Sequence, residues 1–188
     1  MKLISIPSEE LRLSESELAL RLKVPRGCNI KETDLVKEKL LSLMDCKAVA
    51  CVLPLSLTDD GVVLGDIPLK SHDLKRSLLG KREALVLAVT LGMGVERYLL
   101  SLPKIGVAQH FIADSVASAY AEALCDKVQS TVLGNRKAPR FSPGYGDLSL
   151  EAQRPLLALL AAERTVGITL NESLLMRPQK SITAIVGI

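Results

Sequence analysis

The sequence predicts a single α+β domain that spans residues 1–188, and three observations lead to this prediction. The length of 188 residues suits one ordinary domain. Apolar residues make up 48% of the chain and charged residues 24%, which is enough to fill a core and argues against intrinsic disorder. The apolar positions recur at helical spacing in some segments and form short strand-like runs in others, with no internal repeat.

The first third of the chain predicts two helices. Ser14 and Glu17 have the spacing of a capping box, so a first helix is expected to begin there and to end at the stretch 25–27 (Pro-Arg-Gly). A second helix is expected over residues 32–44. Its apolar face is expected to consist of Leu35, Val36, Leu40 and Leu43.

A hairpin and a short helix are expected next. Residues 47–55 are rich in Val and Ala and predict a strand. The stretch 58–61 (Thr-Asp-Asp-Gly) is typical of a hairpin turn, and residues 62–64 are expected to form the returning strand. Ser71 is expected to cap a short helix that runs through Leu79.

The centre of the chain predicts a buried strand and a long helix. Residues 84–90 are apolar without alternation, as in a central strand that is covered on both faces. A helix is expected to open at Val95, and a long central helix is expected from Ile105 to Val132. This long helix is apolar nearly all round except for one polar stripe, formed by Ser115, Ser118, Glu122, Asp126 and Gln129.

The last third predicts a loop, a helix and two strands. Residues 134–148 are rich in Pro, Gly and basic side chains, which is typical of a loop. Ser149 is expected to cap a helix through Glu163, and strands are expected at 168–170 and 181–188.

Composition and charge exclude several classes of function. The net charge of +3 is spread along the chain, and three Tyr, two Phe and no Trp leave little for base stacking, so nucleic-acid binding is not expected. The longest apolar run is the seven residues 156–162, far short of the roughly 18 needed to cross a membrane. Ser5, Pro7 and Glu9 interrupt the N-terminus before a signal-peptide core forms, so we expect a cytoplasmic protein.

The sequence offers no pattern for metal or nucleophile chemistry. Its four cysteines form no C-x-x-C pair, and it has two histidines, so we expect neither a structural metal nor a disulfide; the cysteines are Cys28, Cys46, Cys51 and Cys125. Hydrolase and nucleotide-phosphate motifs do not occur, so no catalytic residue is assigned. The Gly92-Met93-Gly94 turn has Arg97 where a dinucleotide-binding motif has its third glycine, and a sharp strand-to-helix turn is the favoured interpretation.

The most informative loop runs from Arg140 to Asp147. Pro143 fixes its backbone φ and Gly144 permits a positive φ, which predicts a tight turn between Arg140 and Tyr145. Such a turn would bring a guanidinium and a phenol to one small cavity, which suits a ligand with a carboxylate and a flat or cationic part. From these residues alone, a surface turn with an unengaged arginine is equally consistent.

Four stretches occur in the order and spacing of one family. They are Thr90-Leu91-Gly92 after the central strand, the long-helix segment 113–122, the R-x-x-x-G-Y signature at 140–145 with its Ser-Pro-Gly-Tyr-Gly-Asp extension, and the stretch 170–178 before the last strand. Together they resemble the S-adenosylmethionine-binding activation domain of cobalamin-dependent methionine synthase, in its short free-standing form. The likeness covers residues 71–188 well and the first seventy loosely. Where long members have a glutamate on the long helix, this chain has Ser118, with Glu122 one turn further on.

The resemblance implies a largely antiparallel sheet flanked by helices, and a function in reactivating a corrinoid enzyme. Inactive cob(II)alamin would receive one electron from a flavodoxin- or ferredoxin-type donor and a methyl group from S-adenosylmethionine. The cobalamin would be carried by the partner, a methionine synthase that lacks its own activation domain. This chain would then be an accessory subunit that positions the ligand and needs no catalytic residue.

The resemblance also implies a set of cofactor-binding residues. Arg140 would hold the ligand carboxylate, Gly144 would let the backbone approach the ligand, and Tyr145 would line the pocket. Pro143, beside Gly144, belongs to the same set. Two carboxylates would offset the sulfonium charge, namely Glu122 and Asp114.

Two other functions stay open. One is docking of a corrinoid protein without binding of S-adenosylmethionine, and the other is that of an ordinary S-adenosylmethionine-dependent methyltransferase that uses the turn at 92–94. No acidic residue follows a later strand to hold a ribose, which disfavours the methyltransferase.

Overall fold

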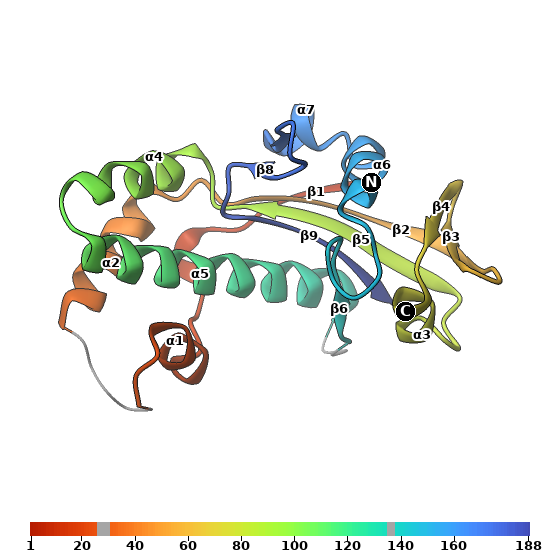
Figure 1. Ribbon diagram of the computed structural model, residues 1–188, viewed down its shortest axis with the longest axis horizontal. Coiled ribbons are helices and arrows are strands. Elements are labelled where there is room, and N and C mark those ends of the chain that lie inside the picture. Colours follow the sequence, from red (N-terminus) through yellow and green to blue (C-terminus); the bar gives the residue numbers. More distant parts are fainter. Residues whose placement is uncertain (26–30, 135–137) are drawn as a thin grey trace.

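A curled antiparallel sheet lies between two layers of helices in the computed structural model, which describes residues 1–25, 31–134 and 138–188 (Figure 1). The strand order is β4-β3-β2-β5-β9-β6, and β1 pairs with the first half of β2. Every strand pair of the described residues is antiparallel, which confirms the predicted fold class. The strands of this sheet are β1 (Lys2–Ser5), β2 (Lys47–Leu57), β3 (Gly61–Leu64), β4 (Ile67–Lys70), β5 (Glu83–Thr90), β6 (Arg140–Phe141) and β9 (Ser181–Gly187).

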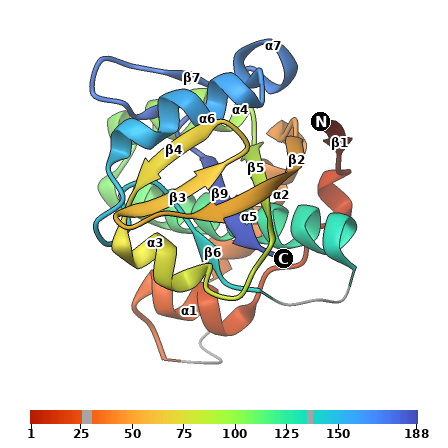
Figure 2. The ribbon, with the colours of Figure 1, turned by 90° about the vertical axis from the view of Figure 1, so that its right-hand side faces the viewer.

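The two faces of the sheet are covered by different helices, as the end-on view in Figure 2 shows. On one face lie α1 (Glu15–Leu22), α2 (Lys31–Leu43), α4 (Met93–Ser101) and the long α5 (Val107–Leu133). On the other lie α3 (His72–Ser77), α6 (Gln153–Leu159) and α7 (Ala162–Val166), with a small hairpin of β7 (Thr169–Leu170) and β8 (Met176–Arg177). Three short 3₁₀ helices are η1 (Ser8–Glu10), η2 (Leu102–Lys104) and η3 (Leu150–Ala152).

Strand β5 shows why an unbroken apolar run forms the centre of this sheet. Alternate side chains of a strand point to opposite faces. Leu85, Leu87 and Val89 therefore enter the core beneath α5, while Ala84, Val86 and Ala88 enter the core beneath α6. All six side chains are fully buried, as the sequence predicted for a strand covered on both sides.

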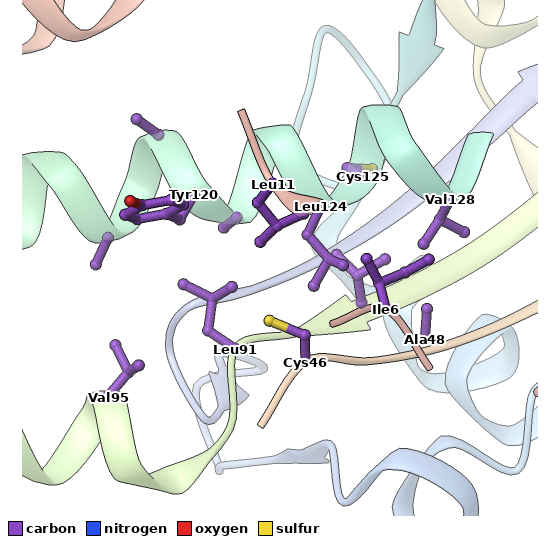
Figure 3. Close-up of a cluster of buried hydrophobic side chains, with 14 of the residues drawn as sticks. Ile6, Leu11, Cys46, Ala48, Leu91, Val95, Tyr120, Leu124, Cys125 and Val128 are labelled. Carbon is purple, nitrogen blue, oxygen red and sulfur yellow. The ribbon is translucent and has the colours of Figure 1, made fainter. Parts of the chain in front are cut away.

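The long helix α5 packs along the sheet and positions the polar stripe. Figure 3 shows Leu124 and Val128 pointing toward Ile6 and Ala48, so the apolar side of the helix faces the N-terminal segment and the strands. The predicted span of 105–132 is close to the observed one. Among the described helices, none combines the length and the hydrophobicity that crossing a bilayer requires.

Two predicted helix starts are confirmed in atomic detail. The Ser14 side chain accepts a hydrogen bond from the backbone N–H of Glu17, at the start of α1. The Ser71 side chain accepts one from the backbone N–H of Leu74, at the start of α3. The hairpin turn at 58–61 also forms, since the Thr58 N–H donates to the Gly61 carbonyl at 3.0 Å.

Other predicted elements need correction. Leu35 was expected on the apolar face of α2, but it is 70% exposed, whereas Leu40 of that face is fully buried. The single helix expected from Ser149 to Glu163 is divided into η3, α6 and α7, and the break between α6 and α7 occurs at Ala161, which adopts a left-handed φ of 46°. The first helix ends at Leu22, earlier than predicted, and positions 26 and 27 of its expected terminator lie outside the described residues.

Candidate functional site

A groove of about 1160 Å³ lies between the C-terminal half of α5 and β6, the strand at one edge of the sheet. Its other walls are the first residues of β9, the loop that follows β6, and the segment from Glu10 to Arg12. Four of the six residues that the sequence singled out line it: Arg140, Pro143, Tyr145 and Glu122. Gly144 lies between two of them in the same turn. The groove is therefore where the predicted ligand residues converge.

Arg140 is fixed by its strand and points at the polar stripe of α5. Its backbone pairs with Val186 of β9. Its guanidinium donates a hydrogen bond to Glu122 Oε2 at 2.8 Å and another to Asp126 Oδ1, and makes a longer contact of 3.4 Å with Gln129 Oε1. Its side chain is only 21% exposed. Arg140 is thus engaged, contrary to the alternative of a free surface arginine.

The spacing of the stripe explains this geometry. Residues four and three apart on a helix lie above one another, so Glu122, Asp126 and Gln129 share one face of α5. Glu122 also lies 3.8 Å from a guanidinium nitrogen of Arg21 on α1. The Gln129 amide donates to the carbonyl of Ala138 at 2.9 Å. This hydrogen bond holds Ala138, two residues before β6, against the helix.

The electrostatics keep Arg140 charged. Burial acts to lower its pKa, but the negative charges of Cys125 in its thiolate form, of Asp126 and of Glu122 outweigh this, and the pKa lies above its usual value. Burial also raises the pKa of Cys125 itself to about 12, with Arg140 acting in the opposite direction and Glu122 and Asp126 adding to the rise. At neutral pH the site therefore contains a permanent cation and an uncharged thiol.

The predicted turn after Arg140 forms. The N–H of Tyr145 donates to the Ser142 carbonyl at 3.0 Å, and Gly144 adopts the positive φ of 89° that its position requires. Pro143 is buried, whereas Tyr145 is 59% exposed and meets Phe141 edge to face, with ring centroids 6.5 Å apart. The turn thus brings a phenol and a guanidinium to one groove, as the sequence predicted.

Asp147 anchors the far end of this turn, a role that the sequence did not reveal. Its carboxylate accepts hydrogen bonds from the Ser71 hydroxyl, from the N–H of His72 at 2.8 Å and from the N–H of Asp73 at 3.1 Å. The hydrogen bond from Ser71 and those from the two N–H groups hold the pKa of Asp147 below its usual value. The loop is therefore fastened to the first turn of α3.

Asp114 lies apart from the groove. It stands eight residues before Glu122, about 12 Å along the helix at 1.5 Å per residue. Lys180 approaches it to 2.7 Å and also donates a hydrogen bond to the Ser118 hydroxyl at 2.9 Å. The structure therefore does not bring Asp114 together with Arg140, and its role as a ligand residue stays a prediction.

Sequence reasoning missed several residues of the groove. Asp126 and Gln129 belong to the recognised stripe but were assigned no role, although their spacing from Glu122 on one helix face would have found them. Glu10 and Arg12 also line the groove. They come from a region more than 100 residues away along the chain, so no local pattern pointed to them.

The Gly92-Met93-Gly94 turn is explained by packing. Gly92 has a positive φ of 87° at the start of α4, and a Cβ there would approach Asp45 to 3.0 Å. A Cβ on Gly94 would lie 2.4 Å from the carbonyl oxygen of Leu43, at the end of α2. The turn is therefore pressed against other backbone, which supports the favoured interpretation of a sharp strand-to-helix turn.

Cys46, Cys51 and Cys125 are free thiols, and Cys28 lies outside the described residues. In the part of the chain that the structure describes, no three His, Cys, Asp or Glu side chains are grouped so as to hold a metal ion.

Comparisons with known proteins bear on the fold. No family model matches the sequence, and no curated protein matches it. Among solved structures, the crystal structure of the MetH reactivation domain bound to AdoHcy superposes on this chain with a TM-score of 0.77. The likeness covers 99% of this chain and 77% of that chain, at 15% sequence identity. The chain therefore has the fold of the MetH reactivation domain.

Proposed function

We propose that this protein binds S-adenosylmethionine in the groove and acts as the reactivation subunit of a cobalamin-dependent methionine synthase. One observation carries the proposal: a chain with the fold of a reactivation domain bound to AdoHcy places its R-x-x-x-G-Y residues, Arg140 and Tyr145, on a single groove. The fold alone is shared by proteins of different function, so the site residues have to support the proposal independently.

The residues of the groove fit S-adenosylmethionine. Its volume of about 1160 Å³ exceeds what a ligand of that size needs. Arg140 offers a planar guanidinium to the ligand carboxylate, and the half-exposed ring of Tyr145 offers a flat surface to the adenine or to the sulfonium. Glu122 and Asp126 supply negative charge for the cationic groups of the ligand.

The chemistry asks this chain for binding and orientation. Cobalamin, carried by the partner and reduced by one electron from a flavodoxin- or ferredoxin-type donor, supplies the nucleophile that takes the sulfonium methyl group. The chain would hold the amino-acid end of the ligand at Arg140, shield it from water in the groove and direct its methyl group outward. This is catalysis by positioning, and it requires no general acid or base from the chain.

One observation favours a second candidate, docking of a corrinoid protein without S-adenosylmethionine. Lys180 donates a hydrogen bond to Ser118, so a cation stands at the helix position where the resemblance leads one to expect a ligand-facing glutamate. Asp114 pairs with this cation at 2.7 Å, so the position lacks the net negative charge that would offset a sulfonium. Ligand binding therefore separates the two candidates.

Calorimetric titration with S-adenosylmethionine and AdoHcy tests the proposal. We expect the wild-type protein to bind both. The Arg140→Ala variant should bind them about 10- to 100-fold more weakly, because a charge-assisted bidentate pair contributes about 1.5–3 kcal/mol and 1.4 kcal/mol is tenfold. Arg140→Lys should recover part of the affinity, since it keeps the charge and loses the planar fork.

Arg154→Ala serves as the matched control, because Arg154 forms an exposed ion pair with Glu151 and does not line the groove. The second step is turnover of a methionine synthase that lacks its own activation domain, after inactivation to the cob(II) state. Recovery should require this protein, S-adenosylmethionine and a reductant together. Equal recovery without the protein would refute the reactivation role, and a wild-type protein that supports docking but binds no S-adenosylmethionine would favour the second candidate.

A further inference from the structure

Three carboxylates of the described residues line the groove, and they differ in how firmly they are held. Glu10 is paired with Lys127 at 2.8 Å. Glu122 lies between Arg140 and Arg21, and its side chain is 28% exposed. Asp126 has Arg140 as its cationic partner, and its side chain is 68% exposed. Asp126 is therefore the carboxylate of this groove that can most readily change partners.

We propose that Asp126 binds the α-ammonium group of the ligand's amino acid, and that it exchanges its contact with Arg140 for this group when Arg140 takes the α-carboxylate. The inference rests on the proposed function and deepens it, because it names the residue that selects an amino-acid zwitterion. The ligand's two charged groups replace an ion pair that the protein already holds in the same groove.

Geometry supports the exchange. An α-amino acid carries its carboxylate and its ammonium on neighbouring atoms, so a carboxylate seated on Arg140 places the ammonium within a few ångströms. Asp126 meets the Nη1 end of that guanidinium, while Glu122 meets the Nη2 end at 2.8 Å. Arg140 can thus keep Glu122 as the partner that orients it and release Asp126.

The energetics point the same way. Asp126 is 68% exposed, so water solvates its carboxylate once it leaves Arg140, while the 21% exposed Arg140 exchanges it directly for the ligand carboxylate, and the release of Asp126 is therefore inexpensive. A half-buried carboxylate such as Glu122 is costlier to strip of its partners. The amino-acid end of the ligand leaves the net charge of the groove unchanged, since one ammonium and one carboxylate enter together, and only the sulfonium of S-adenosylmethionine adds a charge. A ligand with only one of the two charges would leave Arg140 or Asp126 without a new partner.

The test compares AdoHcy with 5′-methylthioadenosine, which keeps the adenosine and the thioether of AdoHcy but lacks its amino acid, so neither compound carries a sulfonium charge. We expect Asp126→Asn to weaken binding of AdoHcy about tenfold and to leave binding of 5′-methylthioadenosine within about twofold. Asp126→Glu should keep part of the affinity. Asp34→Asn is the control, since it removes an exposed carboxylate paired with Lys37 at 3.1 Å on α2, which does not line the groove.

The outcomes separate this inference from the function on which it rests. A wild-type protein that binds neither compound contradicts both. A wild-type protein that binds both, with an Asp126→Asn variant that loses affinity for the two alike or for neither, overturns the exchange and leaves the proposed function standing. Melting curves of each variant without ligand accompany the titrations, and an exposed Asp126 should change the melting temperature by less than about 2 °C.

Discussion

Arg140 has a structural role beside its proposed role as a ligand residue, because the same guanidinium that lines the groove also joins β6 to α5. It is 21% exposed and pairs with two carboxylates, one of which, Glu122, is itself half-buried. Removing the arginine leaves Glu122 with the more distant Arg21 alone. Partner groups left without their hydrogen bonds destabilise a protein more than the bond itself stabilises it.

A stability effect should therefore accompany the loss of ligand affinity. We expect Arg140→Ala to lower the free energy of unfolding by about 1–2 kcal/mol, because the half-buried carboxylate of Glu122 loses its closest hydrogen-bond donor. For a chain of this length that corresponds to a fall of about 2–8 °C in melting temperature. The double variant Arg140→Ala with Glu122→Gln should recover part of the loss. If Arg140→Ala has the melting temperature of the wild type, the ion pair contributes nothing to the stability of the fold.

The buried thiols lead to a prediction about reactivity. Burial, helped by the charges of Asp45 and Glu9, raises the pKa of Cys46 to about 11, and burial raises that of Cys125 to about 12. Since the thiolate is the reactive form, alkylation at pH 8 should be at least about 100-fold slower at both sites in the folded protein than in urea. The rate should rise as the pH approaches 11. Peptide mapping after timed iodoacetamide treatment measures it, and equal rates in both states would contradict the burial.

Among the elements, the loop from Ser142 to Leu148 is held by its two ends. Arg140 fixes the first end through β6, and Asp147 fixes the second through the N–H groups at the start of α3. Gly146 is pressed against α3 as well, since a Cβ there would lie 2.3 Å from the Asp73 carboxylate. Tyr145 is exposed, yet its backbone stands between two anchors.

Releasing one anchor should loosen the turn. We expect Asp147→Ala to lower the protection against hydrogen exchange at the amides of Gly144 and Leu148, which are hydrogen-bonded within the loop. Asp147→Asn should keep part of it, because an amide oxygen still accepts hydrogen bonds. The exposed Asp66→Asn is the control. Unchanged protection in Asp147→Ala would show that the conformation of the loop does not depend on the hydrogen bonds of Asp147.

The same anchor has a pH dependence of known sign. The pKa of Asp147 is lowered in the folded protein, so its charged form stabilises the fold. That contribution is complete above the ordinary aspartate value of about 4 and is lost as the pH falls through the lowered folded value. Protection of the loop in the wild type should therefore persist at pH 5 and decline only in more acidic solution.

The elements also show what local sequence can predict. Ser14 and Ser71 act through hydrogen bonds three residues away, so their helices were predictable from spacing. The two residues of β6 have no period to recognise, and they become a strand only because β9 lies beside them. The break at Ala161 was missed for a related reason, since nothing in an alanine indicates a left-handed φ that tertiary packing imposes.

The residues of the candidate site likewise fall into those that local sequence predicts and those that depend on tertiary packing. Arg140 and Tyr145 were predictable because one short motif holds them both and a tight turn joins them. The pairing of Arg140 with Glu122 and Asp126 was not, because it depends on how β6 docks against a helix whose pattern indicates only that it has a polar stripe. Asp114 lies on the same helix, one residue before the stripe begins, and it does not line the groove.

At the scale of the whole molecule, two cores share one sheet. Leu124 of α5 lies in the core on one face and Leu156 of α6 in the core on the other, and each is fully buried. The strands between them contribute alternate side chains to both cores. A change in either core is therefore transmitted to the strands that support the other, and to β9, which borders the groove.

This arrangement predicts that the chain unfolds as one unit. Leu124→Ala and Leu156→Ala should each lower the free energy of unfolding by about 2–5 kcal/mol, the range for large-to-small changes in a core. Each variant should unfold in a single thermal transition whose midpoint is lower by about 2–4 °C per kcal/mol. Neither variant should show two separate transitions. Calorimetric and van't Hoff enthalpies should agree, and circular dichroism and tyrosine fluorescence should give the same midpoint. If Leu156→Ala splits the transition while Leu124→Ala shifts only one of its parts, the two faces fold independently and the single-domain prediction for residues 1–188 is wrong.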